Sequence, residues 1–209
     1  RTLERGSETI RQQYLEPSIR GEKIGAFATT EPLASTDLSP KAVKSFARRE
    51  ADHYVLNGQK RFITNSPVAD FIVVLCCSDS DGMIELVVDT DLDGVRIGKP
   101  DLKLGNRGQL TADVHFDNVK IPVQKRIGEV NKGLRIALST LTYGRIGIAA
   151  TGVGMAQSAF DQSTQHLKSR QAFGKKLAEF QHWQFRMAER ATQIENSRNL
   201  YIKAAVLMD

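Results

Sequence analysis

Apolar and polar positions fall into three successive patterns along the chain. Residues 1–20 carry apolar side chains at roughly helical spacing. Residues 21–128 read as short strands separated by polar turns, and residues 129–209 return to a helical period with little glycine or proline. The sequence therefore predicts the end of an N-terminal helical domain, a central β-domain and a C-terminal helical domain, in that order.

The first segment is expected to be a helix. Leu3, Ile10, Tyr14 and Leu15 supply its apolar positions, and Pro17 is expected to end it because proline cannot continue a helix interior. Its polar start lacks the apolar core of a signal peptide.

The middle of the chain shows strand and turn signals in alternation. Residues 71–75 form a buried-strand run, residues 84–88 form another, and a polar turn follows at residues 91–94. The Asn-Gly pair at residues 57–58 predicts a hairpin turn, and the Asp-Asn pair at residues 117–118 predicts a second short turn.

Two long antiparallel helices are predicted after residue 129, the second continuing to Asp209. Glycine at position 174 suits a left-handed turn between them. Each helix carries one apolar stripe, and because two helices leave those faces bare, a further helix or another subunit is expected to cover them. The stripes are Leu134, Leu138, Leu141, Ile148 and Met155 on the first helix, and Phe180, Trp183, Met187, Ala191 and Ile194 on the second.

The composition excludes some classes of protein but does not indicate a function. The chain has 209 residues, with 41% hydrophobic and 25% charged, and no apolar run long enough to span a membrane. Cys76 and Cys77 are neighbours in a strand and point to opposite faces, which argues against a disulfide or metal pair and favours a reducing compartment. The net charge of +5 indicates a basic solvated surface first and a polyanionic small ligand second. Nucleic acid comes third, because no basic tract with interleaved aromatic residues is present.

Six short segments then occur in a recognisable order. The chain resembles the acyl-CoA dehydrogenase family on these segments, which span nearly its whole length. They are residues 25–32 (GAFATTEP), 34–37 (ASTD), 56–65 (LNGQKRFITN), 103–105 (KLG), 143–145 (YGR) and 170–175 (RQAFGK). The resemblance implies an α+β fold: residues 1–20 end an N-terminal helical domain, and residues 21–128 form a central antiparallel β-barrel-like domain. Residues 129–209 would then supply the first two long antiparallel helices of a four-helix bundle truncated after that pair.

The resemblance implies an FAD site in the β-domain. A flavin needs a planar apolar wall, hydrogen bonds to its polar ring edge and donors for its pyrophosphate. By resemblance, residues 27–30 and 62–64 line the isoalloxazine, a hydroxyl of Thr30 or Thr64 contacts the nitrogen that receives hydride, and Thr36 serves the pyrophosphate and the thioester. The implied cofactor residues of this domain are Phe27, Thr29, Thr30, Ser35, Thr36, Phe62, Ile63 and Thr64. The alternative is that the threonines are only strand formers and Phe62 is a core residue.

Three further cofactor contacts are implied on the helices. Arg170 offers a fork of donors that matches phosphate oxygens. By resemblance, Arg170, Phe173 and Gln181 reach FAD bound mainly by a neighbouring subunit, so a homo-oligomer, a dimer or tetramer, is expected. The alternative is a solvated arginine at a helix end.

Substrate contacts are implied by the resemblance at Thr36, Thr142, Gly144 and Arg145. Arg145 lies on the apolar stripe of the first long helix, where a charge is costly unless paired. The resemblance assigns it to the CoA moiety, and a structural salt bridge is the alternative. Thr142 stands where many relatives carry aspartate, so an acyl-CoA and an acyl carrier thioester both stay open. Ser35 replaces the usual glycine of the 34–37 turn.

The catalytic base is expected outside this chain. Removing a proton from the α-carbon needs a carboxylate with a raised pKa. In the family this glutamate either precedes the arginine of the first long helix, where this chain has Gly144, or lies downstream of Asp209. Glu31 is not the base by resemblance. No catalytic residue is therefore assigned here, and this chain alone is expected to be inactive.

The resulting hypothesis is an FAD-dependent acyl-CoA dehydrogenase that performs α,β-dehydrogenation of an acyl thioester and passes electrons to an electron-transferring flavoprotein. It is expected in the bacterial or archaeal cytoplasm or the mitochondrial matrix, with no membrane partner. Two alternatives stay open: a flavin monooxygenase on the same scaffold, and a non-catalytic FAD- or nucleic-acid-binding protein.

Overall fold

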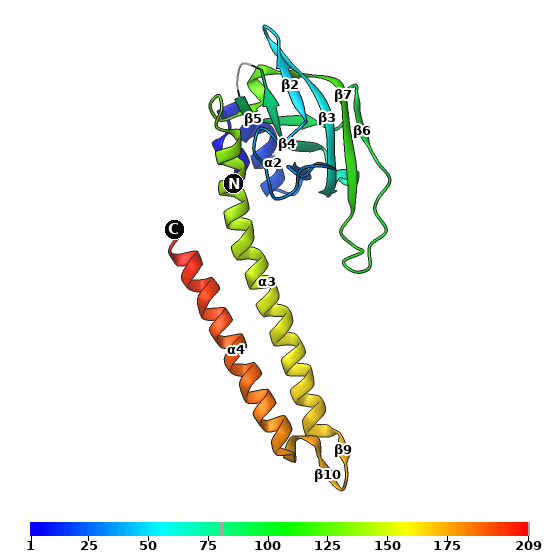
Figure 1. Cartoon of the computed structure of the whole chain (residues 1–209), viewed down its shortest axis with the longest axis vertical. Helices are drawn as coiled ribbons and strands as arrows, with labels where there is room; N and C mark the ends of the chain where they lie inside the picture. The colour runs from blue at the N-terminus through cyan, green and yellow to red at the C-terminus, as the bar shows by residue number, and fades with distance from the viewer. Residues whose placement is uncertain (80–81, 209) are drawn as a thin grey trace. The chain divides into compact units, whose positions relative to one another are not determined.

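The computed structural model describes residues 1–79 and 82–208 (Figure 1). By contacts the chain divides into two compact units, Arg1–Thr140 and Leu141–Asp209. The elements of the first unit are η1 (Thr2–Arg5), α1 (Glu8–Ile10), η2 (Arg11–Leu15), α2 (Glu16–Ile19), β1 (Gly25–Ala28), β2 (Phe46–Arg49), β3 (His53–Thr64), η3 (Ser66–Val68), β4 (Phe71–Ser78), β5 (Gly82–Asp89), β6 (Val95–Ile97), β7 (Thr111–Pro122), η4 (Val123–Lys125) and β8 (Arg126–Ile127). Helix α3 (Gly133–Ser169) begins in the first unit and continues in the second, followed by β9 (Gln171–Ala172), β10 (Lys175–Lys176), η5 (Leu177–Glu179) and α4 (Gln181–Val206).

The N-terminal segment is helical as predicted, but Pro17 does not end it. Pro17 lies in the first turn of α2, where a missing N–H costs little. The preceding turn, η2, is a π-helix in which the Glu16 N–H donates to the Arg11 carbonyl. This wider turn accommodates the proline, and the helix continues to Ile19.

The predicted α+β fold is confirmed, and the β-domain is an eight-stranded mixed sheet that does not close into a barrel across the described residues. Its strand order is β6-β7-β3-β2-β4-β5-β8, with β1 paired to β4 off this path. Most neighbours are antiparallel, but β1 and β2 both pair with β4 in parallel. Across the described residues this path is open, with β6 and β8 at its two ends. The buried strands predicted at residues 71–75 and 84–88 are confirmed as β4 and β5.

The two turns predicted at residues 57–58 and 117–118 are wrong, because both pairs lie inside long strands. Strands β3 and β7 pair throughout, with Leu56 opposite Val119 and Gly58 opposite Phe116. Between these pairs one residue of β3 faces two of β7, which is a β-bulge. Asn118 has a φ of 53° there, and its N–H donates to Asn57 Oδ1 at 2.8 Å. Two-residue hairpin turns and some β-bulges both use residues at positive φ, so the sequence signal is the same for both.

Replacing Gly58 by alanine is expected to lower the free energy of unfolding by about 1–3 kcal/mol. Gly58 has a φ of 147°, and a Cβ there would lie 2.7 Å from the Cα of Ser45. Urea denaturation measures the effect. The control is Gly105→Ala, since a Cβ at Gly105 would meet no atom of the described residues within 4 Å. Equal stability of the two variants would contradict the prediction.

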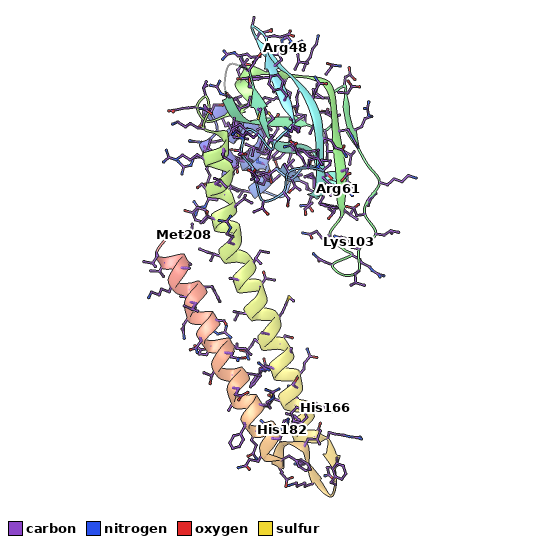
Figure 2. All side chains as sticks on the ribbon, viewed as in Figure 1. Arg48, Arg61, Lys103, His166, His182 and Met208 are labelled. Carbon is purple, nitrogen blue, oxygen red and sulfur yellow. The ribbon has the colours of Figure 1, made fainter. Side chains whose placement is uncertain are left out.

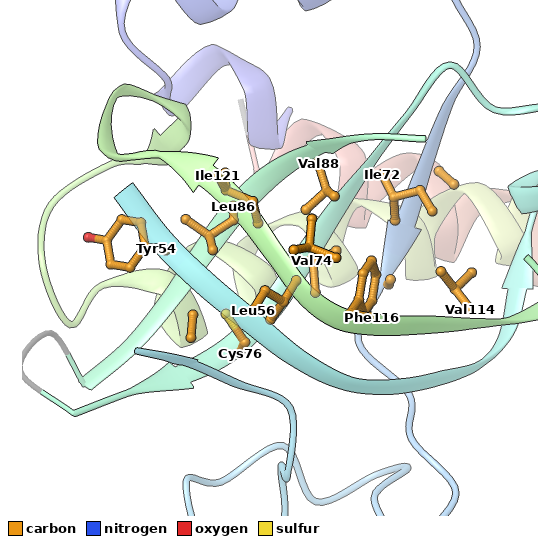
Figure 3. Close-up of a cluster of buried hydrophobic side chains, with 14 of the residues drawn as sticks. Tyr54, Leu56, Ile72, Val74, Cys76, Leu86, Val88, Val114, Phe116 and Ile121 are labelled. Carbon is orange, nitrogen blue, oxygen red and sulfur yellow. The ribbon is translucent and has the colours of Figure 1, made fainter. Parts of the chain in front are cut away.

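Apolar side chains are buried on both faces of the sheet. The first core cluster, of which Figure 3 shows the central residues, includes Tyr54, Leu56, Ile63, Ile72, Val74, Leu86, Val88, Val114, Phe116 and Ile121. The second core cluster joins the sheet to the N-terminal helical segment and contains Ile10, Tyr14, Phe71, Val73, Val87 and Ile127. Each fully buried side chain of this size contributes roughly 1.5–3 kcal/mol, so both faces stabilise the domain.

The second unit is a pair of antiparallel helices, as predicted (Figure 1). Arg198 Nη2 donates to Gln157 Oε1 at 2.8 Å and joins α4 to α3. The left-handed glycine is confirmed, since Gly174 has a φ of 77°, although the connection is a small β9–β10 hairpin rather than a direct helix-to-helix turn. Helix α4 ends at Val206, and Asp209 lies outside the described residues.

Apolar side chains remain uncovered on these helices. Ile148 is 74% exposed and Met155 is 68% exposed, although both belong to the predicted stripe. Among the described residues, no helix has the length and apolar character needed to cross a membrane.

Candidate functional site

Two segments that the sequence marked as flavin-lining meet at one end of the β-domain. Thr29 and Thr30 directly follow β1, and β3 ends at Thr64. The Arg61 N–H donates to the Thr30 carbonyl at 2.9 Å. The structure therefore brings residues 29–30 and 62–64 together, although more than thirty residues separate them in sequence.

A second β-bulge shapes this end of β3. Lys60 pairs with Val114 and Ile63 pairs with Ala112, so Arg61 and Phe62 together face one residue, Asp113. The extra residue shifts the alternation of faces by one position. Lys60 and Ile63 are buried, whereas Arg61 and Phe62 are both exposed.

The Phe62 side chain is therefore exposed and not buried in the core. It is 56% exposed, and its φ of 59° lies in the left-handed region that bulky residues rarely adopt. The Arg61 guanidinium lies over its ring, 4.7 Å from the centroid. Figure 2 shows Arg61 and Lys103 at one end of the sheet and Arg48 at the other. The alternative that Phe62 is a core residue is wrong.

A buried ion pair lies directly behind this site. Lys60 Nζ is 2.8 Å from Glu31 Oε1, and both side chains are almost completely buried. The same ammonium donates to the Thr29 carbonyl at 3.3 Å. The Glu31 carboxylate also accepts the N–H groups of Lys44 at 2.7 Å and Ser45 at 3.0 Å. The pair thus joins β3, the end of β1 and the segment before β2.

The charges of this pair stabilise each other. Burial lowers the pKa of the Lys60 ammonium. Burial alone would raise the pKa of Glu31, but the hydrogen bond and charge of Lys60, together with Lys44 and Ser45, bring the pKa of Glu31 below its ordinary value. Glu31 is therefore an ionised structural carboxylate.

Sequence reasoning missed Lys60 and Asp113. The signal for Lys60 was its even-numbered position in β3, which it shares with the inward-facing Tyr54 and Leu56. A lysine buried at such a position requires an acidic partner. Asp113 gave no comparable signal, because its role depends on which residue of β3 it faces.

The loop after β1 turns tightly and leaves hydroxyls exposed. Glu31 N–H donates to the Ala34 carbonyl at 2.7 Å, and Ala34 N–H donates back at 3.2 Å. Ser35 and Thr36 follow this turn and are both exposed. Their side chains are thus available to an anionic ligand.

Three of the cofactor residues implied in the β-domain have side chains that are partly or fully buried. Phe27 is half-buried and packs against the second core cluster. Ile63 lies in the first core cluster at 2% exposure, so only its backbone can contact a ligand. Thr29 is buried, and its carbonyl accepts from Lys60.

The three implied residues of the second unit surround the β9–β10 hairpin. Arg170 follows α3, its N–H donating to the His166 carbonyl at 2.8 Å, and Gln181 is the first residue of α4. Phe173 lies at the hairpin turn with a φ of 53° and is 96% exposed. All three side chains are exposed, and among the described residues the one ring contact of Phe173 is an edge contact with Phe180 at 6.5 Å.

The implied substrate residues on α3 are exposed as well. Thr142, Gly144 and Arg145 all lie on the surface of the second unit. Within this chain the helix face that carries Arg145 is open to solvent, so its charge has no burial cost here.

Comparison with known proteins identifies relatives over nearly the whole chain. Residues 26–119 match the acyl-CoA dehydrogenase middle domain, and residues 131–209 match the acyl-CoA dehydrogenase C-terminal domain. The chain is 42% identical over 208 residues to a short-chain specific acyl-CoA dehydrogenase of Clostridium acetobutylicum, covering 98% of this chain and 54% of the relative. It is 40% identical to a caffeyl-CoA reductase-Etf complex subunit of Acetobacterium woodii, covering 98% of this chain and 54% of the relative.

A solved structure shows the same fold. Butyryl-CoA dehydrogenase from Megasphaera elsdenii superimposes with a TM-score of 0.92 at 37% identity, covering 97% of this chain and 54% of that chain. The chain thus spans about half the length of the relatives that it matches.

Proposed function

The chain belongs to the acyl-CoA dehydrogenase family, and from that membership we propose that it supplies the FAD-binding β-domain and part of the helical domain of an acyl thioester dehydrogenase. The observation that supports the proposal most directly is the exposed Phe62 ring. It lies where the end of β3, at Thr64, comes close to Thr30 after β1. An aromatic side chain at 56% exposure in a strained backbone conformation indicates a surface built to contact a ligand.

The residues present fit a flavin. Phe62 offers a planar apolar face, and Thr64 lies two residues further along the same strand, on the same side. When bound, FAD would accept the hydride that leaves the substrate β-carbon. Thr30 and Thr64 would hydrogen-bond the polar edge of the ring, with Phe27, Thr29 and the Ile63 backbone beneath it. The exposed Ser35 and Thr36 would donate to the pyrophosphate.

The second unit would complete the cofactor site of another copy. Arg170, Phe173 and Gln181 form an exposed cation, aromatic and amide group around the β9–β10 hairpin. A guanidinium and an uncovered ring suit the phosphate and adenine parts of FAD. This arrangement supports a homo-oligomer, a dimer or tetramer.

The substrate is proposed to be an acyl-CoA or an acyl carrier thioester. The exposed Arg145, with Thr142 and Gly144 on the same helix, would bind its phosphate-bearing arm, and Thr36 its thioester end. The base that removes the α-proton is proposed to lie downstream of this chain. The Acetobacterium relative belongs to an Etf complex, which supports an electron-transferring flavoprotein as the electron acceptor. Bacterial relatives support the cytoplasm, with the mitochondrial matrix as the second compartment.

Phe62→Ala is expected to weaken FAD binding by roughly tenfold, because it removes the stacking face. Titration of the apoprotein with FAD, followed by flavin absorbance, measures this. The control is Phe185→Ala, since Phe185 is 61% exposed on α4 and lies outside the proposed site. A wild-type protein that cannot be reconstituted with FAD would overturn the proposal. Anaerobic addition of a short-chain acyl-CoA to the full-length holoprotein, in which the proposed downstream base would be present, then tests the activity: loss of oxidised flavin colour supports dehydrogenation, and its retention favours the monooxygenase alternative.

A further inference from the structure

We propose that Asp113 is a positioning residue that holds the second bulge of β3 and thereby sets the orientation of Phe62 and Thr64. The inference deepens the proposed function, because it takes Phe62 as part of the flavin wall. It assigns a role to a carboxylate on a different strand, β7.

The Asp113 carboxylate contacts β3 both before the bulge and inside it. Its Oδ1 accepts the Phe62 N–H at 3.3 Å, and its Oδ2 accepts Gln59 Nε2 at 3.2 Å. Its own carbonyl accepts the Gly98 N–H at 2.8 Å, which fixes Asp113 against the segment after β6. One side chain therefore bridges Gln59, which precedes the bulge, and Phe62, which lies inside it.

The bulge needs such a bridge because its backbone does not take part in the regular hydrogen bonding between β3 and β7. Regular pairing between β3 and β7 stops at Lys60 and resumes at Ile63, so Phe62 has no ladder partner for its N–H. The Asp113 carboxylate supplies that acceptor. Phe62 also keeps a φ of 59°, a conformation that persists only where surrounding contacts hold it.

The bulge decides which face each side chain occupies. With strict alternation from the buried Lys60, Phe62 and Thr64 would point inward and Ile63 outward. With the bulge, Ile63 enters the first core cluster, and Phe62 is left on the exposed face. Loss of the Asp113 contacts is therefore expected to disturb the wall without removing any residue from it.

The test compares Asp113→Ala with Asp113→Asn, which keeps an oxygen for the Phe62 N–H. Asp117→Ala is the matched control, because Asp117 is an exposed aspartate of the same strand that pairs with Arg96 instead. The first readout needs no cofactor: the amide-to-α-proton coupling constant of Phe62, which reports φ. The second is the FAD dissociation constant. Urea denaturation verifies that each variant folds, and Asp113→Ser replaces the alanine variant if that one does not.

The alanine variant is expected to change the Phe62 coupling and to raise the FAD dissociation constant about tenfold, while the asparagine and control variants stay within about twofold of wild type. An unchanged coupling in Asp113→Ala overturns the inference whatever FAD does. A changed coupling with an unchanged dissociation constant also overturns it, because the bulge then does not serve the site. If wild-type protein binds no FAD, the proposed function fails, and the coupling alone decides whether Asp113 holds the bulge.

Discussion

Lys60→Met is expected to lower the free energy of unfolding by about 3–5 kcal/mol. The Glu31 carboxylate would stay buried at about 4% exposure without its counter-ion. The two backbone N–H groups of Lys44 and Ser45 would remain as its hydrogen-bond donors, and they carry no full charge. The variant would also lose the contact to the Thr29 carbonyl and so loosen the strand end of the proposed flavin site.

A double variant separates the cost of the orphaned charge from that of lost packing. Lys60→Met with Glu31→Gln leaves no buried charge, and the new amide oxygen still accepts from the Lys44 and Ser45 N–H groups. It is therefore expected to be more stable than Lys60→Met alone. Lys120→Met, an exposed lysine of β7, is the control and is expected to stay within about 0.5 kcal/mol of wild type. Urea denaturation measures all four proteins, and a single variant as stable as the control would sink the prediction.

Glu85→Gln is expected to remove a pH dependence of stability that the wild-type protein shows between about pH 4.5 and 8. Glu85 lies on β5 with 0% exposure, opposite Leu75 of β4 and Ile127 of β8. Neither of its carboxyl oxygens has a hydrogen-bond partner among the described residues. The first turn of α3 lies against this strand, since a Cβ on Gly133 would be 2.8 Å from the Glu85 nitrogen. Burial raises the pKa of Glu85 from 4.5 to about 8.

The sign of the effect follows from proton binding. Between the unfolded pKa of 4.5 and the folded pKa of about 8, the folded protein holds a proton that the unfolded chain has released. The free energy of unfolding therefore falls as the pH rises, by up to roughly 1.4 kcal/mol per pH unit, and the total loss by pH 8 is on the order of a few kcal/mol. Below pH 4.5 the carboxyl group is protonated in both states, and its contribution is constant.

The measurement is the difference in unfolding free energy between Glu85→Gln and wild type at several pH values. The variant is expected to become more stable relative to wild type as the pH rises from 5 to 8.5. Burying the amide adds a difference in stability that does not change with pH. Glu129→Gln, at an exposed glutamate, is the matched control and is expected to give a flat difference. A flat difference for Glu85→Gln would show that the Glu85 carboxyl has an ordinary pKa in the folded protein.

The sequence alone predicted the features that depend on near neighbours in the chain. Strands β4 and β5, the two long helices and the left-handed Gly174 all follow from local periodicity or from one residue's backbone preference. The ordered motifs also indicated the family, because short segments at fixed spacing survive as a pattern in the sequence.

The tertiary structure decided what depends on strand register. Whether residues 57–58 form a turn or a bulge depends on pairing with β7, more than fifty residues away. The same pairing places Asp113 opposite Phe62 and sends Phe62 outward, while the Lys60–Glu31 pair needs β3 beside the end of β1. Local propensity contains no information on these contacts, because positive φ, buried charge and an unpaired carboxyl are each stable only in the company of residues distant in sequence.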